Sequence, residues 1–235
     1  MTQTKYESKT IVLKKTIDET NAFAMVEEKK TSLFKKLLKT PKREEVHIHS
    51  FNLYYECILM VSGKYAADYY RNTTHTISVD SNVREVIIGD GLFPIRSKSI
   101  LEKTFVGKRG KNKITLQLDE HVFVEEEDVL IFDHHGREIK FPFKINSKTI
   151  ENYPQRVLEK NSPNIKKPEI THDAAIKKLK EFLKKPIDSE IRELNEEFIL
   201  REITLVYVPI FEARLIGPKK KICIMRIDAV RKKIL

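Results

Sequence analysis

The chain has few glycines, seven among 235 residues, and none of them forms a phosphate-binding loop. A P-loop and a Gly-x-Gly-x-x-Gly motif are both absent, and the segment GKRGKN has neither the P-loop spacing nor the following Lys-Ser/Thr. The Gly-x-Ser-x-Gly turn of hydrolases is absent as well. The sequence offers no partial set of pre-positioned polar groups, so we predict no catalytic and no cofactor-binding residues and favour a protein that is not an enzyme.

Cysteine is also scarce, with only Cys57 and Cys223 in the chain. Neither belongs to a Cys-x-x-Cys pair, which argues against a zinc ribbon or a thiol-redox site. Both lie in apolar, strand-like runs, where a reduced and buried thiol is the usual state. We therefore expect two structural thiols and no disulfide.

Long apolar runs are missing too, and no stretch reaches the length needed to span a bilayer. The first residues, MTQTKYESKTIVLKK, lack the basic start and apolar run of a signal peptide. These absences predict a soluble protein of the cytoplasm. Residues 31–43, TSLFKKLLKTPKR, combine an apolar stripe with lysines, which also allows a peripheral contact with an anionic membrane surface.

What the sequence has in excess is positive charge: 44 Lys and Arg against 34 Asp and Glu, a net +10. Between Arg214 and Leu235 there are eight basic residues and one acidic residue, Asp228, a local balance of +7. Concentrated positive charge indicates an anionic partner such as nucleic acid, and the candidate contacts are Lys219, Lys220, Lys221, Arg231, Lys232 and Lys233. These two groups fall at opposite ends of a predicted strand, about 17–20 Å apart. A lysine-rich background, as in heat-adapted proteins, explains the same excess without recognition.

Changes of pattern divide the chain into five segments. They are an N-terminal helical segment (1–44), a first antiparallel sheet unit (45–97), a β-rich insert (98–145), a linker with three prolines (146–170) and a second helix-plus-sheet unit (171–235).

Local signals refine this division. Gly63 predicts a turn between two strands, and Gly89 with Gly91 predicts a hairpin or a loop. A second hairpin is predicted around Asp133–Gly136. Thr171 is the expected N-cap of a helix, and a shorter helical stretch is expected at residues 189–198.

Two parts of the chain follow the same plan. When Glu56 is aligned with Glu212, apolar residues of the two predicted strands coincide on one face: Phe51 with Tyr207, Tyr55 with Phe211, Cys57 with Ala213 and Leu59 with Leu215. Further on, Asp80 coincides with Asp228. Each copy follows an amphipathic helical region, and a helix can cover the apolar face of a small antiparallel sheet. The pattern therefore predicts an internal duplication.

The end of the second copy, CIMRIDAVRKKIL, resembles the closing strands of the PepSY domain family. The resemblance rests on Ile227-Asp228-Ala229 and the final pair Ile234-Leu235, covers residues 171–235, and extends faintly to Val79-Asp80. It implies a helix packed on a small antiparallel sheet, in proteins thought to modulate peptidases. The predicted fold class is thus α+β, with two PepSY-like helix-plus-antiparallel-sheet units and an intervening β-rich insert.

Two pairs of residues are of the types found in catalytic or metal sites. Glu56 and Glu212 are a carboxylate pair, and such pairs can perform acid–base catalysis, but duplication alone accounts for them. We expect them to be exposed or to cap backbone groups. His47 and His49 lie about 7 Å apart on one strand face, yet no third ligand follows, so no metal site is predicted.

The sequence alone names no reaction or ligand. The primary hypothesis is a non-enzymatic binding or scaffold protein with a protein partner. The alternatives are a nucleic-acid-binding protein that uses the C-terminal basic residues, and a peptidase modulator or hydrolase accessory protein, as the PepSY resemblance implies.

Overall fold

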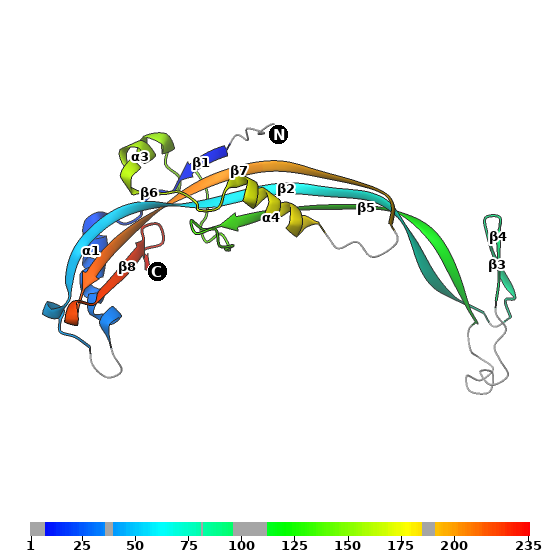
Figure 1. The fold of residues 1–235 in the computed structure, drawn as a ribbon, viewed down its shortest axis with the longest axis horizontal. Coiled ribbons are helices and arrows are strands. Elements are labelled where there is room, and N and C mark those ends of the chain that lie inside the picture. The colour runs from blue at the N-terminus through cyan, green and yellow to red at the C-terminus, as the bar shows by residue number, and fades with distance from the viewer. Residues whose placement is uncertain (1–7, 36–39, 81, 96–111, 185–190) are drawn as a thin grey trace. The chain divides into compact units, whose positions relative to one another are not determined.

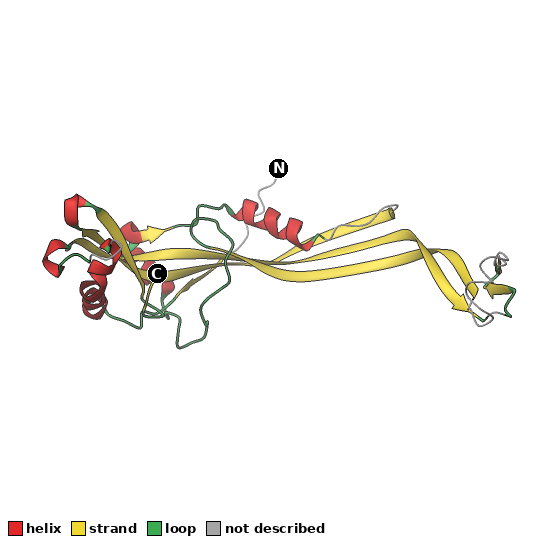
Figure 2. Cartoon of the chain, turned by 90° about the horizontal axis from the view of Figure 1, so that it is seen from below, coloured by secondary structure: helices red, strands yellow, loops and turns green. Residues whose placement is uncertain are grey.

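The computed structural model shows a chain built mainly from strands (Figure 1). It describes residues 8–35, 40–80, 82–95, 112–184 and 191–235. Three strands are unusually long: β2 (His47–Val79), β5 (Asn112–Phe132) and β7 (Ile191–Ile216). Figure 2 shows these strands side by side, with few helices around them.

The long strands belong to one sheet with the order β5-β2-β7-β8-β9. Strands β8 (Ile222–Asp228) and β9 (Lys233–Ile234) continue it by antiparallel pairing. Two short strands add parallel pairs: β1 (Ser8–Val12) lies against β7, and β6 (Ile165–Lys166) lies against β2. A separate hairpin is formed by β3 (Glu85–Ile88) and β4 (Gly91–Pro94).

The described residues include three α-helices and four short 3-10 turns. The α-helices are α1 (Glu19–Lys29), α3 (Pro154–Lys160) and α4 (His172–Leu183). The 3-10 turns are η1 (Lys30–Phe34), η2 (Arg43–Glu45), η3 (Ser162–Asn164) and η4 (Pro218–Lys220). No helix among the described residues has both the length and the apolar character needed to cross a membrane.

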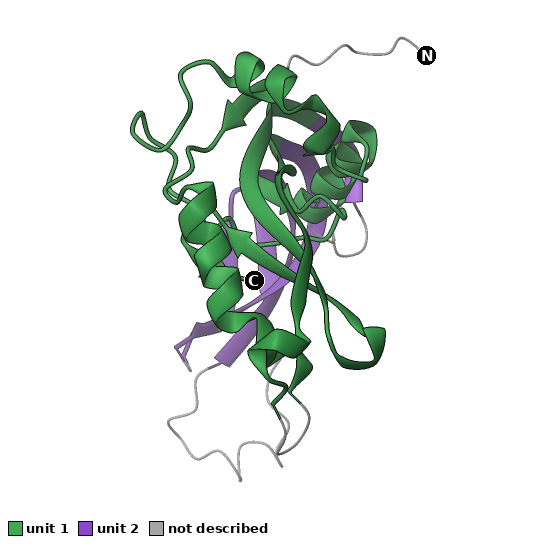
Figure 3. Ribbon diagram, turned by 90° about the vertical axis from the view of Figure 1, so that its left-hand side faces the viewer, with its two compact units in different colours: residues 1–64, 127–184, 198–235 green, residues 65–126, 185–197 purple. Residues whose placement is uncertain are grey.

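The chain divides into two compact units (Figure 3). Unit 1 comprises residues 1–64, 127–184 and 198–235, and unit 2 comprises residues 65–126 and 185–197. Unit 1 contains the helices, the β7–β8 hairpin and most of the buried apolar residues. Unit 2 contains the β3–β4 hairpin and a ribbon held by ion pairs such as Arg71–Glu120 and Arg192–Asp119.

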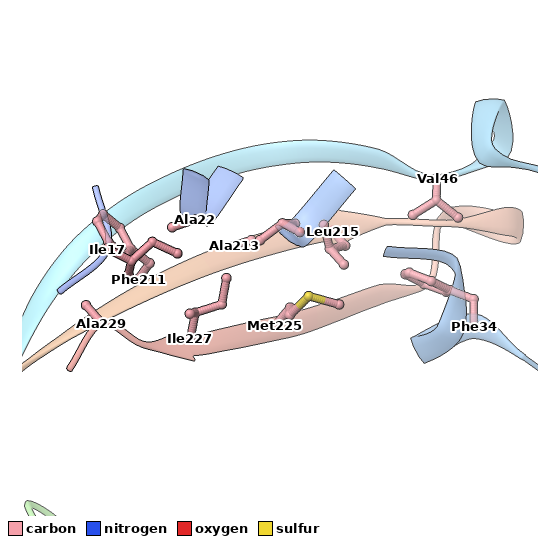
Figure 4. Close-up of a cluster of buried hydrophobic side chains, with 11 residues drawn as sticks. Ile17, Ala22, Phe34, Val46, Phe211, Ala213, Leu215, Met225, Ile227 and Ala229 are labelled. Atoms are coloured by element: carbon pink, nitrogen blue, oxygen red, sulfur yellow. The ribbon is translucent and has the colours of Figure 1, made fainter. Parts of the chain in front are cut away.

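The main core of unit 1 lies between α1 and the β7–β8 hairpin (Figure 4). Asp18 caps α1 by accepting the backbone N–H of Asn21 at 2.8 Å, and the helix buries Ala22 and Val26. These side chains pack on buried residues of the hairpin, among them Phe211, Ala213, Leu215, Met225 and Ile227. This arrangement follows from the alternation of the strands, because every second residue points to the same face.

The predicted fold class is wrong. The two similar segments do not build two helix-plus-antiparallel-sheet units, because β2 and β7 are neighbours in a single sheet. The rings of Phe51 and Phe211, one from each strand, stack on each other with centroids 5.3 Å apart and planes at 5°. The described part of the predicted β-rich insert adds β5 to this sheet as well. Two strands with similar apolar faces have thus paired with each other.

The first copy has no hairpin because Gly63 does not form a turn. It lies inside β2, where the chain continues as one strand. A Cβ atom at this position would lie 3.1 Å from Leu179 Cδ2, from the Phe198 ring and from the carbonyl oxygen of Ile199. Glycine is therefore needed for the close approach of α4 and β7, a use of glycine that resembles a turn signal in the sequence.

Other local predictions have mixed outcomes. The hairpin at Gly89 and Gly91 is confirmed by β3 and β4, and Thr171 caps α4 by accepting the N–H of Ala174. The hairpin predicted around Asp133–Gly136 is present as a tight turn, with a hydrogen bond from Gly136 N–H to the Asp133 carbonyl and one antiparallel bridge between Phe132 and Glu138. The helix at 189–198 is wrong over its described residues, since β7 begins at Ile191. Strand pairing has overridden the local helical pattern there.

Candidate anion-binding pocket and the charged network beside the sheet

Four charged side chains from four strands meet in unit 1. Lys166 Nζ on β6 donates hydrogen bonds to Glu56 Oε1 on β2 at 3.0 Å and to Glu212 Oε2 on β7 at 3.1 Å. Arg226 on β8 pairs directly with Glu56, and its Nε lies 3.9 Å from Glu212 Oε2, too far for a hydrogen bond. The strand register explains the meeting, because Glu56 is opposite Lys166 and Glu212 is opposite Arg226.

His134 completes this network, with its Nδ1 3.4 Å from Glu56 Oε2. Burial lowers the pKa of His134 below its usual value, and the neighbouring charge of Glu56 only partly opposes this. Desolvation acts in the same direction on Lys166, but hydrogen bonds and charge from Glu56 and Glu212 outweigh it and raise the pKa of Lys166. Burial thus favours the neutral form of His134, whereas the hydrogen bonds that Lys166 donates favour its own charged form.

The expectation that Glu56 and Glu212 are exposed or cap backbone groups is wrong. Their side chains are only 10% and 18% exposed. Two carboxylates face two cations, so the charges of the network balance. Each carboxylate is engaged by a cation, so neither Glu56 nor Glu212 is free to act as a base. The similarity of the two strands singles out the two glutamates, whereas Lys166 and Arg226 carry no local sequence signal that identifies them.

Asp228 does act as a cap. Its carboxylate accepts the backbone N–H groups of Val230 and Arg231, each at 2.9 Å, and pairs with Arg231 Nε at 2.6 Å. Arg231 also stacks over the Phe143 ring. This candidate anion contact is therefore engaged within the protein.

The six candidate basic residues do not form one group. Lys219, Lys220 and Lys221 stand at the turn between β7 and β8, whereas Arg231, Lys232 and Lys233 follow the far end of β8. The seven residues of β8 separate the two groups.

The turn at Lys219–Lys221 is conformationally strained. Lys219 and Lys220 both have positive φ, 58° and 57°. This is the requirement of a tight hairpin turn, which asparagine and glycine normally meet. A lysine in this region is disfavoured by roughly 1 kcal/mol. Two consecutive lysines therefore occupy positions where asparagine or glycine would give a more stable turn.

A cavity of about 610 Å³ adjoins this turn. Its apolar wall is formed by Phe34, Pro41 and Pro218, and its charged residues are Lys42, Glu45, Lys219 and Lys221. Lys221 Nζ lies 6.0 Å from the centre of the Phe34 ring. The cavity therefore joins the described part of residues 31–43 to the basic turn, two segments that lie far apart in the sequence.

Gly217 fixes the apolar wall of this cavity. A Cβ atom there would lie 2.5 Å from the Phe34 ring, a distance that side chains cannot adopt. The absence of a side chain at Gly217 lets the ring of Phe34 pack against the start of the turn.

The remaining candidates are the histidines and the two cysteines. No group of three or more histidine, cysteine, aspartate or glutamate residues suited to a metal occurs in the parts of the chain that the structure describes. Cys57 is buried, as expected, and burial raises the pKa of its thiol to about 12. Cys223 is half-buried, with its Sγ 3.9 Å from the Leu33 carbonyl.

Comparisons with known proteins do not identify the chain. No family model, no curated protein and no solved structure matches it. The resemblance to PepSY domains stays a prediction, and the function has to be argued from the site itself.

Proposed function

We propose that this protein is a non-enzymatic binding protein, and that its ligand is an anion held at the basic turn between β7 and β8. The observation that carries the proposal is the convergence of Lys42, Lys219 and Lys221 on one cavity. Within the described residues, no carboxylate forms an ion pair with any of the three ammonium groups. Uncompensated positive charge around a concave surface favours an anionic ligand.

The charged network beside the sheet supports a binding role over a catalytic one. Its carboxylates are neutralised by Lys166 and Arg226, so they stabilise the fold and do not offer a base. The lysines at the turn have the opposite character, because they are exposed and the backbone beneath two of them is strained. Strain that folding does not require is a reason to look for function.

A titration with inorganic pyrophosphate, followed by backbone amide NMR shifts, tests the proposal. We expect the shifts to concentrate at Lys219–Lys221 and Lys42, and to disappear when Lys219 and Lys221 are both changed to Ser. The matched control changes Lys232 and Lys233 to Ser, which removes the same charge at the other end of β8. Equal loss of shifts in the two double variants would contradict a site at the turn.

The same variants separate this proposal from nucleic-acid binding. A surface that neutralises phosphates along a strand should use both basic groups and lose affinity steeply with salt. Tight oligonucleotide binding that both double variants weaken alike would favour nucleic acid. The hypotheses of a protein partner and of a peptidase modulator stay predictions, since no feature of the site bears on them.

A further inference from the structure

We infer that the ligand of this cavity is a small amphiphilic anion: an apolar body that bears one carboxylate or phosphate group. The inference rests on the proposed binding function and names the chemical class of its ligand. It follows from the size of the cavity, the nature of its wall and the position of its charges.

The size of the cavity excludes an inorganic anion as a complete occupant. Pockets for drug-sized molecules measure roughly 300–1,000 Å³, and this cavity measures about 610 Å³. A phosphate or sulfate ion would leave most of that volume unfilled. A ligand that fills the cavity needs a larger body beside its charged group.

The wall determines what that body is. Phe34 is only 7% exposed, so the apolar surface that a ligand can cover belongs mainly to the rings of Pro41 and Pro218 beside it. Contact between such a wall and an apolar group lowers the free energy of binding, because it removes both surfaces from water. A sugar or a highly charged body would lose its hydration without compensation.

The charges lie around the same wall. Lys42, Lys219 and Lys221 contribute three positive charges, against one negative charge from Glu45. The Glu45 carboxylate is already engaged by the backbone N–H of Lys42 at 2.7 Å. A local balance of +2 therefore faces the cavity, and an anionic group beside an apolar body satisfies both parts of the surface.

Fluorescence titration with the probe 1-anilinonaphthalene-8-sulfonate, an aromatic sulfonate, tests this inference, with decanoate as the competitor. We expect saturable probe binding that decanoate displaces. Changing Lys219 and Lys221 together to Ser should weaken decanoate binding at least roughly tenfold, because two charged contacts are lost. Changing Lys232 and Lys233 to Ser should leave it unaltered. Near-UV circular dichroism of each variant confirms that the probe is not reporting a loosened fold.

A second variant separates the apolar part of the site from the charged part. Thr40 lines the cavity and is exposed, so Thr40→Trp should fill the cavity without removing a charge. We expect this variant to lose decanoate binding and to keep the pyrophosphate response. Decanoate binding that survives Thr40→Trp or the change at Lys219 and Lys221 would overturn the inference. Pyrophosphate binding without decanoate binding would overturn the inference and leave the proposed function intact, whereas the absence of both would overturn both.

Discussion

Glu56 and Glu212 lie on different strands and accept hydrogen bonds from the same ammonium group, Lys166 Nζ, at 3.0 and 3.1 Å. In the sequence, Glu56 and Glu212 align with each other because the strands that carry them have similar patterns of apolar residues. The structure brings them together because β2 and β7 are neighbours in one sheet, with β6 beside β2 and β8 beside β7. The pair is thus part of a charge-balanced network that joins strands distant in sequence.

Removal of the shared cation should destabilise unit 1. Lys166→Met keeps much of the side-chain volume but leaves two partly buried carboxylates with Arg226 alone. Because Lys166 is 30% exposed, we expect a loss of roughly 2 kcal/mol, below the full cost of breaking a buried pair. Urea denaturation measures the loss, with the exposed neighbour Lys167→Met as control. Equal stability of the two variants would mean that the network contributes little.

His134 should make the stability depend on pH. Its pKa is lowered in the folded protein, so the unfolded chain binds the proton more readily. The contribution of neutral His134 to the free energy of unfolding is therefore complete above the usual histidine pKa of about 6.5. It is lost as the pH falls through the pKa that His134 has in the folded protein. The charged and titratable groups facing His134 are Glu56, His135, Arg226 and Lys166.

The test compares wild type with His134→Gln by urea denaturation at pH 7.5 and at pH 5. We expect wild type to lose more stability between the two pH values than the variant does, because the variant has no imidazole to protonate. Identical losses would show that His134 does not contribute to the pH dependence.

Gly63 should tolerate no side chain, although it lies in a strand. In Gly63→Ala the new methyl group would meet Leu179, Phe198 and the backbone of Ile199 at 3.1 Å. We expect a loss of about 1–3 kcal/mol from overpacking. Ser62→Ala, one residue away, should change stability by less than about 0.5 kcal/mol. A neutral or stabilising effect of Gly63→Ala would show that α4 does not pack closely on β2.

Phe211 should be a major contributor to the core. It is 1% exposed and stacks on Phe51, so Phe211→Ala should cost about 3–5 kcal/mol through lost transfer energy and the cavity left behind. The control is Phe123→Ala, because that ring is 63% exposed. If the two variants had equal denaturation midpoints, the burial of Phe211 would be contradicted.

Short-range features of this fold could be predicted from the sequence, but its topology could not. The cap at Thr171 and the hairpin at Gly89 depend on nearby residues, and both are present. Gly63 was misleading because a glycine needed for close packing and a glycine needed for a turn look the same in a sequence. The residues 191–198 show helical spacing, yet they form a strand because β2 offers a pairing partner.

The candidate site shows the same division. Lys219, Lys220 and Lys221 stand out in the sequence through their charge. Their relation to Phe34 and Lys42 does not, since more than 170 residues separate the two segments and only the fold joins them. Gly217 gives no sign of its role until the Phe34 ring is seen against it.

The central claim is that the strained Lys219 at the β7–β8 turn serves binding and not folding, and one pair of variants tests it most directly. Lys220 does not line the cavity, so Lys220→Gly should raise stability by about 1 kcal/mol and leave decanoate binding unchanged. Adding Lys219→Asn keeps a residue suited to positive φ but removes a charge that faces the cavity. We predict that the double variant is at least as stable as Lys220→Gly and binds decanoate several-fold more weakly. A double variant that is more stable than wild type and binds decanoate equally well would contradict the claim.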